Sequence, residues 1–111
     1  MINVKVESHP LGGYKSIEIS GHAEYAEYGK DIVCAGVSVL AETAVLGLKH
    51  NVGIKPLINK EQGCFILKLP DNMTAEEYKK TAMILKTIIL GLEDISKSYP
   101  LNIHMEIIEE V

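Results

Sequence analysis

The sequence predicts a single α+β domain in which two helices pack on a mostly antiparallel sheet, in the order ββαββαβ. Three observations support this fold class. Short segments alternate apolar and polar residues, two longer segments repeat apolar residues at helical spacing, and turn residues separate them. A chain of 111 residues is long enough to build one hydrophobic core, so residues 1–111 are expected to form one domain.

Two strands are expected at the start of the chain. Apolar residues alternate with polar ones from Ile2 to Glu7, and again from Tyr14 to Ser20. The segment between them contains a proline and two glycines, which is typical of a turn. The two strands are therefore expected to form a hairpin.

The first helix is predicted to begin after Asp31, whose carboxylate can accept a backbone N–H of the first turn. Ile32 would then be the first helical residue and Cys34 the third, and the helix would continue to about His50. Apolar residues cover more than one stripe of this segment, which is typical of a helix that is buried on two sides.

The second buried side of this helix would be another subunit in a domain of this size. Three small residues would allow a close approach there, namely Gly36, Ala41 and Gly47.

A second hairpin is expected in the middle of the chain. The segments Ile54–Asn59 and Cys64–Leu69 have strand-like patterns, and the polar residues 60–63 between them are typical of a turn. Pro56 has no backbone N–H to donate, so its strand is expected at a sheet edge or with a bulge.

The second helix has a clear start signal. Thr74 and Glu77 match a capping box, and Met73 and Tyr78 stand at the two positions of a hydrophobic staple. Apolar residues then recur at helical spacing opposite a lysine-rich face, which predicts an amphipathic helix lying on the sheet.

The end of this helix is predicted at Tyr99-Pro100, because proline cannot continue a helix. From Leu101 to Ile108 apolar and polar residues alternate again, which predicts a final strand.

The charge of the chain argues against direct nucleic-acid binding. The net charge is -4, and all eleven basic residues are lysines. Arginine is the usual reader of guanine and phosphate, and nucleic-acid-binding domains carry basic patches. An acidic surface would instead attract a basic peptide weakly.

Other classes of site have no support in the sequence. No segment resembles a signal peptide or approaches the ~20 apolar residues of a membrane span, and two cysteines without a disulfide pattern suit a reducing cytoplasm. The cysteines and the four histidines are too scattered for a zinc cluster, and no phosphate-binding glycine loop is present. We therefore expect no metal and no cofactor.

The segment from His22 to Cys34 carries the chemistry. His22 would lie at a strand end and Cys34 in the first turn of a helix, with a polar loop between them. A nucleophilic thiol needs a base to take its proton and a field that favours the thiolate. The histidine supplies the first, and the helix N-terminus supplies part of the second. This arrangement predicts a Cys-His catalytic dyad.

Other interpretations of these residues stay open. His22 would cap the strand end, and Cys34 would be an inert helix residue. Asp31 either orients the imidazole or only caps the helix, and Ser38 either donates to the site or bonds back to its own helix. The glycines at positions 21 and 29 would act as hinges of the loop. Cys64 lies in a strand-like run and is interpreted as structural.

At this point the chain resembles a known family, the ribosomal-processing cysteine proteases of Firmicutes and their relatives. The resemblance covers the whole chain and rests on one spaced pattern: Gly21-His22-Ala23, Gly29, Asp31, Cys34-Ala35 and Ser38.

The resemblance implies that residues 1–111 form a single cysteine protease domain with His22 as general base and Cys34 as nucleophile. It implies removal of a short N-terminal extension from the twenty-seventh protein of the large ribosomal subunit, after a pair of aromatic residues in a lysine-bearing, hydrophobic peptide. It also implies a homodimer. The loop would be mobile and would order over the substrate. Tyr25 and Tyr28 would then either contact the aromatic pair or simply face solvent on the loop.

Two rival classes remain. One is a non-catalytic binding module that docks on a ribosomal protein and keeps its peptide affinity without Cys34. The other is a redox-sensing or structural dimer in which Cys34 is reactive without any dependence on His22.

Overall fold

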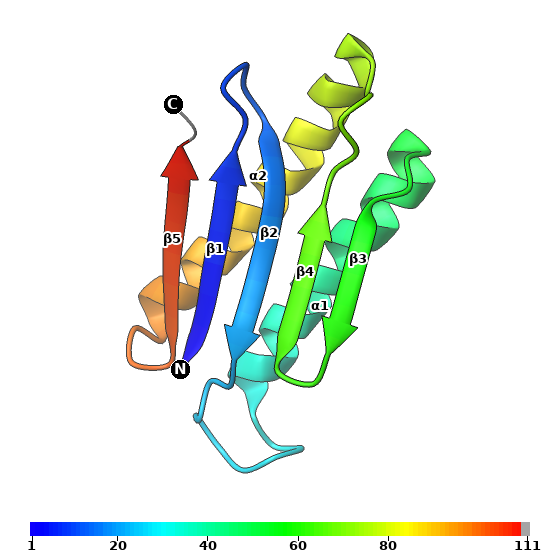
Figure 1. Cartoon of the computed structure of the whole chain (residues 1–111). Helices are drawn as coiled ribbons and strands as arrows, with labels where there is room; N and C mark the ends of the chain where they lie inside the picture. The colour runs from blue at the N-terminus through cyan, green and yellow to red at the C-terminus, as the bar shows by residue number, and fades with distance from the viewer. Residues whose placement is uncertain (110–111) are drawn as a thin grey trace.

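The computed structural model describes residues 1–109 and has the predicted element order (Figure 1). The elements are β1 (Ile2–Ser8), β2 (Tyr14–Gly21), α1 (Ile32–Gly47), the π-helical turn η1 (Leu48–Val52), β3 (Leu57–Glu61), β4 (Cys64–Lys68), α2 (Ala75–Ser98) and β5 (Ile103–Glu109).

The five strands form one mixed sheet in the order β3-β4-β2-β1-β5. Both predicted hairpins form, and β2 also pairs with β4 in the antiparallel sense. The last strand, β5, instead runs parallel to β1. The long helix α2 returns the chain to the end of the sheet at which β1 begins, so β5 leaves that end in the same direction (Figure 1).

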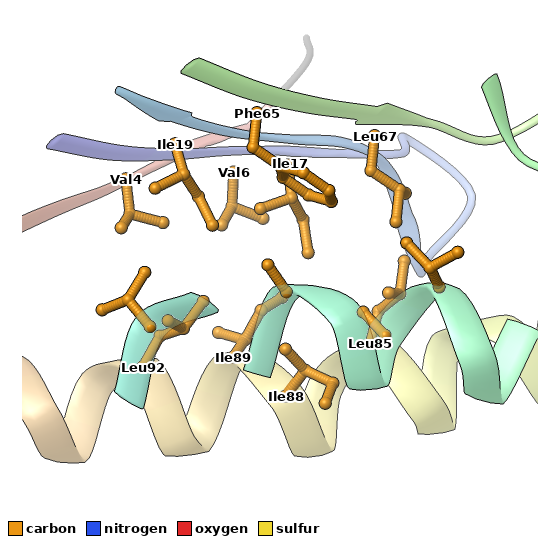
Figure 2. Packing of buried hydrophobic residues seen from close by; sticks show 14 of the residues in the cluster. Val4, Val6, Ile17, Ile19, Phe65, Leu67, Leu85, Ile88, Ile89 and Leu92 are labelled. Carbon is orange, nitrogen blue, oxygen red and sulfur yellow. The ribbon is translucent and has the colours of Figure 1, made fainter. Parts of the chain in front are cut away.

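Both helices cover the same face of the sheet, and the core lies between the two layers (Figures 1 and 2). Inward side chains of the strands, among them Val4, Ile17 and Leu67, point toward the buried face of α2 (Figure 2). Burying such aliphatic side chains supplies most of the favourable free energy of folding, at about 25 cal/mol per Å².

The small residues of α1 face α2 of the same chain, which differs from the expectation that they would face another subunit. A Cβ on Gly36 would lie 3.4 Å from Ile95, and one on Gly47 would lie 3.1 Å from Ile84. Ala41 is buried in the core. What α1 still exposes is a stripe at a spacing of seven residues, formed by Ile32, Val39 and Leu46.

The start of α1 is as predicted, with Asp31 as its N-cap and Ile32 as its first residue. The α-helix ends at Gly47, earlier than the predicted His50, and the chain continues through η1. Gly53 then ends the helical segment with a φ of 80° and donates its N–H to the carbonyl of Leu48. A left-handed glycine at this position is the usual helix stop.

The segment Ile32–Val52 is 21 residues long and reaches a mean hydropathy of 1.7, so by length and composition it is able to cross a membrane. This corrects the expectation that no such stretch exists. The core helix of a soluble protein meets the same criterion. We interpret the segment as a core helix because it contributes six buried apolar residues to the core: Val33, Val37, Ala41, Ala44, Val45 and Leu48.

The second hairpin is shorter at its start than predicted. Strand β3 begins at Leu57 rather than Ile54, because Ile54 and Pro56 bury their side chains before pairing starts. The turn contains only Gln62 and Gly63. The edge position predicted from Pro56 is confirmed, since β3 is an outer strand of the sheet.

Helix α2 follows its predicted signals. Thr74 Oγ1 accepts from the N–H of Glu77, whose carboxylate accepts from the N–H of Thr74. This capping box fixes the start at Ala75, and the helix ends at Ser98 immediately before the predicted Tyr99-Pro100 stop.

Candidate active site

The candidate site lies at the end of the sheet where β2 stops and α1 begins (Figure 1). His22 directly follows Gly21, the last residue of β2, and Cys34 lies in the first turn of α1. Residues 22–31 connect the two elements. The fold therefore brings the two predicted catalytic residues to the same end of the molecule.

Asp31 uses both of its carboxylate oxygens. Oδ1 accepts the backbone N–H groups of Val33 and Cys34, each at 3.0 Å. Oδ2 accepts those of Tyr25 at 3.0 Å and Ala26 at 3.4 Å. One oxygen therefore caps α1, and the other ties the preceding loop to the helix start.

These contacts also set the charge state of Asp31. Desolvation raises its pKa, but the four backbone N–H bonds, led by the one from Cys34, outweigh this effect and hold the pKa below 3.8. Asp31 is therefore an anion near neutral pH. Asp31 caps α1 as predicted. Within residues 1–109 its side chain makes no hydrogen bond to His22, so an orienting role stays a prediction.

Cys34 is half-buried, and its sulfur has a defined partner. The backbone N–H of Ala23 donates to Sγ at a distance of 3.4 Å. Ala23 is itself only 1% exposed and belongs to the core. Its carbonyl accepts from Nδ2 of Asn102 at 2.9 Å. Ala23 is thus bonded through both its backbone N–H and its backbone carbonyl.

His22 is exposed, and its ring lies against the turn between β3 and β4. A Cβ on Gly63 would lie 3.1 Å from Nε2 of His22. The carbonyl of Gly63 also accepts the N–H of Gly21 at 2.9 Å. This turn therefore forms one wall of the site.

Gly21 occupies a position that admits only glycine. Its φ is 89°, and a Cβ there would come within 2.3 Å of the carbonyl oxygen of Met1. His22 is the first residue after this strand. No hydrogen bond joins His22 to Cys34 in the part of the chain that the structure describes, so the dyad stays a prediction.

The loop contains the two predicted substrate-contacting tyrosines in different settings. Tyr25 packs edge-on against Tyr99, with ring centroids 5.3 Å apart. Tyr28 is 97% exposed. Gly29 has a φ of 86° with open space around it, which fits a turn at the loop tip.

Ser38 is exposed on α1. Among the described residues its hydroxyl makes neither of the two hydrogen bonds considered from the sequence, since it bonds neither to the site nor back to its own helix. Cys64 is half-buried in β4, where it pairs with Ser20 and Glu61. Residues 1–109 contain no group of three or more His, Cys, Asp and Glu side chains that would hold a metal ion.

The contacts of three residues in the site were not predicted from the sequence. Gly63 carried a turn signal, but nothing in the sequence placed that turn beside His22. Asn102 carried no signal at all, because its role arises from the pairing of β5 with β1. Ala23 appeared only as part of the spaced pattern, and its backbone contact follows from the local fold.

A family model described as cysteine protease Prp matches residues 1–104 of the chain. The chain belongs to this family. Two proteins named ribosomal processing cysteine protease Prp are similar to it. The one from Bacillus subtilis is 32% identical over 107 residues, covering 95% of this chain and 96% of the relative. The one from Staphylococcus aureus is 32% identical over 110 residues, covering 95% and 97%.

Solved structures show the same likeness. The Staphylococcus aureus Prp in complex with a covalently linked product peptide matches with a TM-score of 0.82 and 29% identity, covering 97% of this chain and all of that one. The same protease with a substrate peptide also has a TM-score of 0.82, at 28% identity. A Streptococcus mutans protein, SMU.848, has a TM-score of 0.81 at 25% identity, covering 99% and 96%. The chain is thus a cysteine protease with the Prp fold.

Proposed function

We propose that this Prp-family protease removes a short N-terminal extension from the twenty-seventh protein of the large ribosomal subunit, using Cys34 and His22. The observation that carries the proposal is the position of Cys34 in the first turn of α1, with a backbone N–H directed at its sulfur and His22 next in sequence to the donor of that N–H. Membership of the Prp family supports the assignment to ribosomal processing.

In the proposed mechanism His22 takes the proton of Cys34, and the thiolate attacks the scissile carbonyl carbon. The C–N bond then breaks, and His22 gives its proton to the leaving amine. Water attacks the resulting thioester and releases the acid product and the free thiol. Closure of the His22–Cys34 distance would accompany peptide binding, since catalytic hydrogen bonds often tighten only in the complex.

Backbone N–H groups at the start of α1 are one candidate for holding the oxyanion of the tetrahedral intermediate. The N–H groups of Val33 and Cys34 are already bonded to Asp31. The N–H of Ala35 is bonded to the carbonyl of Asp31. The N–H of Ala23, which donates to the sulfur of Cys34, is therefore a further candidate donor to the oxyanion.

The proposed substrate is a lysine-bearing, hydrophobic peptide cut after an aromatic pair. Tyr25 and Tyr28 border the site and expose aromatic surface, which supports their contact with that pair. A net charge of -4 supports attraction of a basic peptide. We propose a cytoplasmic location, where the substrate and reduced cysteines would both be found.

We also propose that the enzyme is a homodimer through its helical face. The exposed stripe of α1 and the exposed Met83 and Leu90 of α2 supply apolar surface for such a contact.

The test is mass spectrometry of a lysine-bearing peptide with a Phe-Phe pair after incubation with wild type, His22→Ala and Cys34→Ala. Cleavage after the aromatic pair by wild type alone is the expected result. An intact peptide in all three samples with retained binding would instead favour a non-catalytic binding module. Cleavage that persists in His22→Ala would refute the role of His22.

A further inference from the structure

Ala23 connects Cys34 to a residue that is distant in sequence. Its N–H donates to Sγ of Cys34 at 3.4 Å, and its carbonyl accepts from Nδ2 of Asn102 at 2.9 Å. The three residues come from the loop after β2, the start of α1 and the turn before β5. No feature of the sequence brings them together.

The backbone of Asn102 is held in place by hydrogen bonds of its own. Its N–H donates to the carbonyl of Tyr99 at 2.9 Å, and its own carbonyl accepts the N–H of Ile2 at 2.9 Å. Both main-chain groups are therefore engaged, and the side chain is half-buried. A side chain on such an anchored backbone loses little further freedom when it donates a hydrogen bond.

The N–H of Ala23 matters because two backbone donors of the first turn of α1 are already bonded to Asp31. The N–H groups of Val33 and Cys34 bond to Asp31, which is itself an anion and disfavours a second negative charge close by. A thiolate at Cys34 therefore needs a donor that Asp31 does not hold. Ala23 supplies such a donor.

We propose that Asn102 is a positioning residue that holds the Ala23 N–H against the sulfur of Cys34 and thereby favours the reactive thiolate. This inference rests on the proposed role of Cys34 as nucleophile. The bond from Asn102 to the Ala23 carbonyl restrains the backbone of Ala23, which limits the movement of its N–H away from the sulfur.

The test is alkylation of the full-length protein by iodoacetamide across the pH range in which thiols ionise. Peptide mapping by mass spectrometry follows Cys34 and Cys64 separately, so that Cys64 serves as a reference within the same molecule. The variants are Asn102→Ala, Asn102→Asp and Asn59→Ala. Aspartate keeps the shape of asparagine, but its carboxylate cannot donate to the Ala23 carbonyl near neutral pH. Asn59 is exposed on β3 and is the matched control.

The expected result is a roughly two- to tenfold slower alkylation of Cys34 near neutral pH in both Asn102 variants, which is the range for one lost hydrogen bond. The half-maximal rate should be reached at higher pH, while Cys64 and the Asn59→Ala protein keep their wild-type rates. Equal or faster alkylation of Cys34 would overturn the proposal. A joint rise at Cys34 and Cys64 would also overturn it, since the bond would then only hold the fold together.

Peptide cleavage measured on the same samples separates this inference from the proposed function. A fall in kcat with little change in KM is expected for the Asn102 variants. Failure of the wild type to cut the Phe-Phe peptide would refute the proposed substrate, whereas the alkylation rates decide the role of Asn102 by themselves.

Discussion

The imidazole of His22 lies against Gly63, so close that a Cβ on Gly63 would stand 3.1 Å from Nε2. Gly63 belongs to the tight turn between β3 and β4, and its φ of 75° favours glycine in any case. Backbone freedom and room for the ring therefore both require glycine at this position. The second requirement bears on function, because it concerns the proposed general base.

Gly63→Ala should lower peptide cleavage beyond what its loss of stability explains. Gly53 is the matched control, since its φ is 80° and a Cβ there would meet nothing within 4 Å. Both substitutions should cost about 1–2 kcal/mol of stability through left-handed strain. Only Gly63→Ala should displace the imidazole, so kcat measured well below the melting temperature should fall in that variant alone. Equal kcat values for Gly63→Ala and Gly53→Ala would show that the turn between β3 and β4 does not contribute to the site.

Asp31→Ser should separate the two tasks of Asp31. The serine hydroxyl can still cap α1 but cannot also reach the N–H groups of Tyr25 and Ala26. Asp31→Ala should cost about 1 kcal/mol more than Asp31→Ser in urea unfolding, because it loses the cap as well. Both variants should show faster hydrogen exchange in the loop. If the loop amides of both variants exchanged as slowly as in the wild type, the bonds of Tyr25 and Ala26 to Oδ2 would not be what orders the loop.

Asp31 should also make the stability of the protein depend on acid pH. The native pKa lies below 3.8, so the folded state binds this proton more weakly than the unfolded chain. The contribution is complete above the unfolded pKa and is lost as the pH falls through the lower native pKa. The difference in unfolding free energy between wild type and Asp31→Asn should shrink below pH 3.8. A difference that stays constant into acid would argue against the lowered pKa.

Substitutions of Tyr25 and Tyr28 should differ in their effect on protein stability but should have the same effect on KM. Tyr25→Ala loses an edge-on ring contact with Tyr99, worth about 0.5–1.5 kcal/mol, whereas the exposed Tyr28 has nothing comparable to lose. Both substitutions should raise KM for the Phe-Phe peptide if the rings contact the aromatic pair. Thermal melts and initial rates on the same preparations measure the two effects, and unchanged KM values in both variants would refute the contact.

Val39→Glu and Leu46→Glu should dissociate the proposed homodimer, because each places a charge in the exposed apolar stripe of α1. Asn59→Glu adds the same charge at the exposed edge strand β3 and should leave the dimer intact. Light scattering after size-exclusion chromatography measures the mass. A wild-type mass of 12.2 kDa would show a monomer and contradict the proposal directly.

The elements of this fold could be predicted because each has a local cause. Alternation gave the strands, Asp31 marked the start of α1, and the Thr74–Glu77 box marked the start of α2. The direction of β5 could not be predicted in this way, because a strand's period is the same in parallel and antiparallel pairs. The prediction that the small residues of α1 face another subunit was wrong for a related reason. Helix–helix contact inside one chain leaves the same sequence pattern as contact between subunits.

The residues of the candidate site also divide into those with a local sequence signal and those that depend on the arrangement of strands. The places of His22 after a strand and of Cys34 in the first turn of a helix were predicted from one chain segment and are confirmed. Their catalytic roles stay a prediction. Gly63 and Asn102 reach the site only through the arrangement of strands, so nothing near them in sequence announces their contacts.

The parallel pairing of β1 with β5 joins two strands at opposite ends of the sheet's chain order. The hydroxyl of Ser8 donates to the carbonyl of Ile108, 100 residues away, and Asn102 reaches Ala23 from the turn just before β5. Contacts of such long range form late, because the chain between them must first be ordered. A nascent chain in which β5 has not yet been made therefore has its cysteine and histidine without the ordered turn that carries Asn102, so the proposed support of Cys34 would be completed only after β5 has paired.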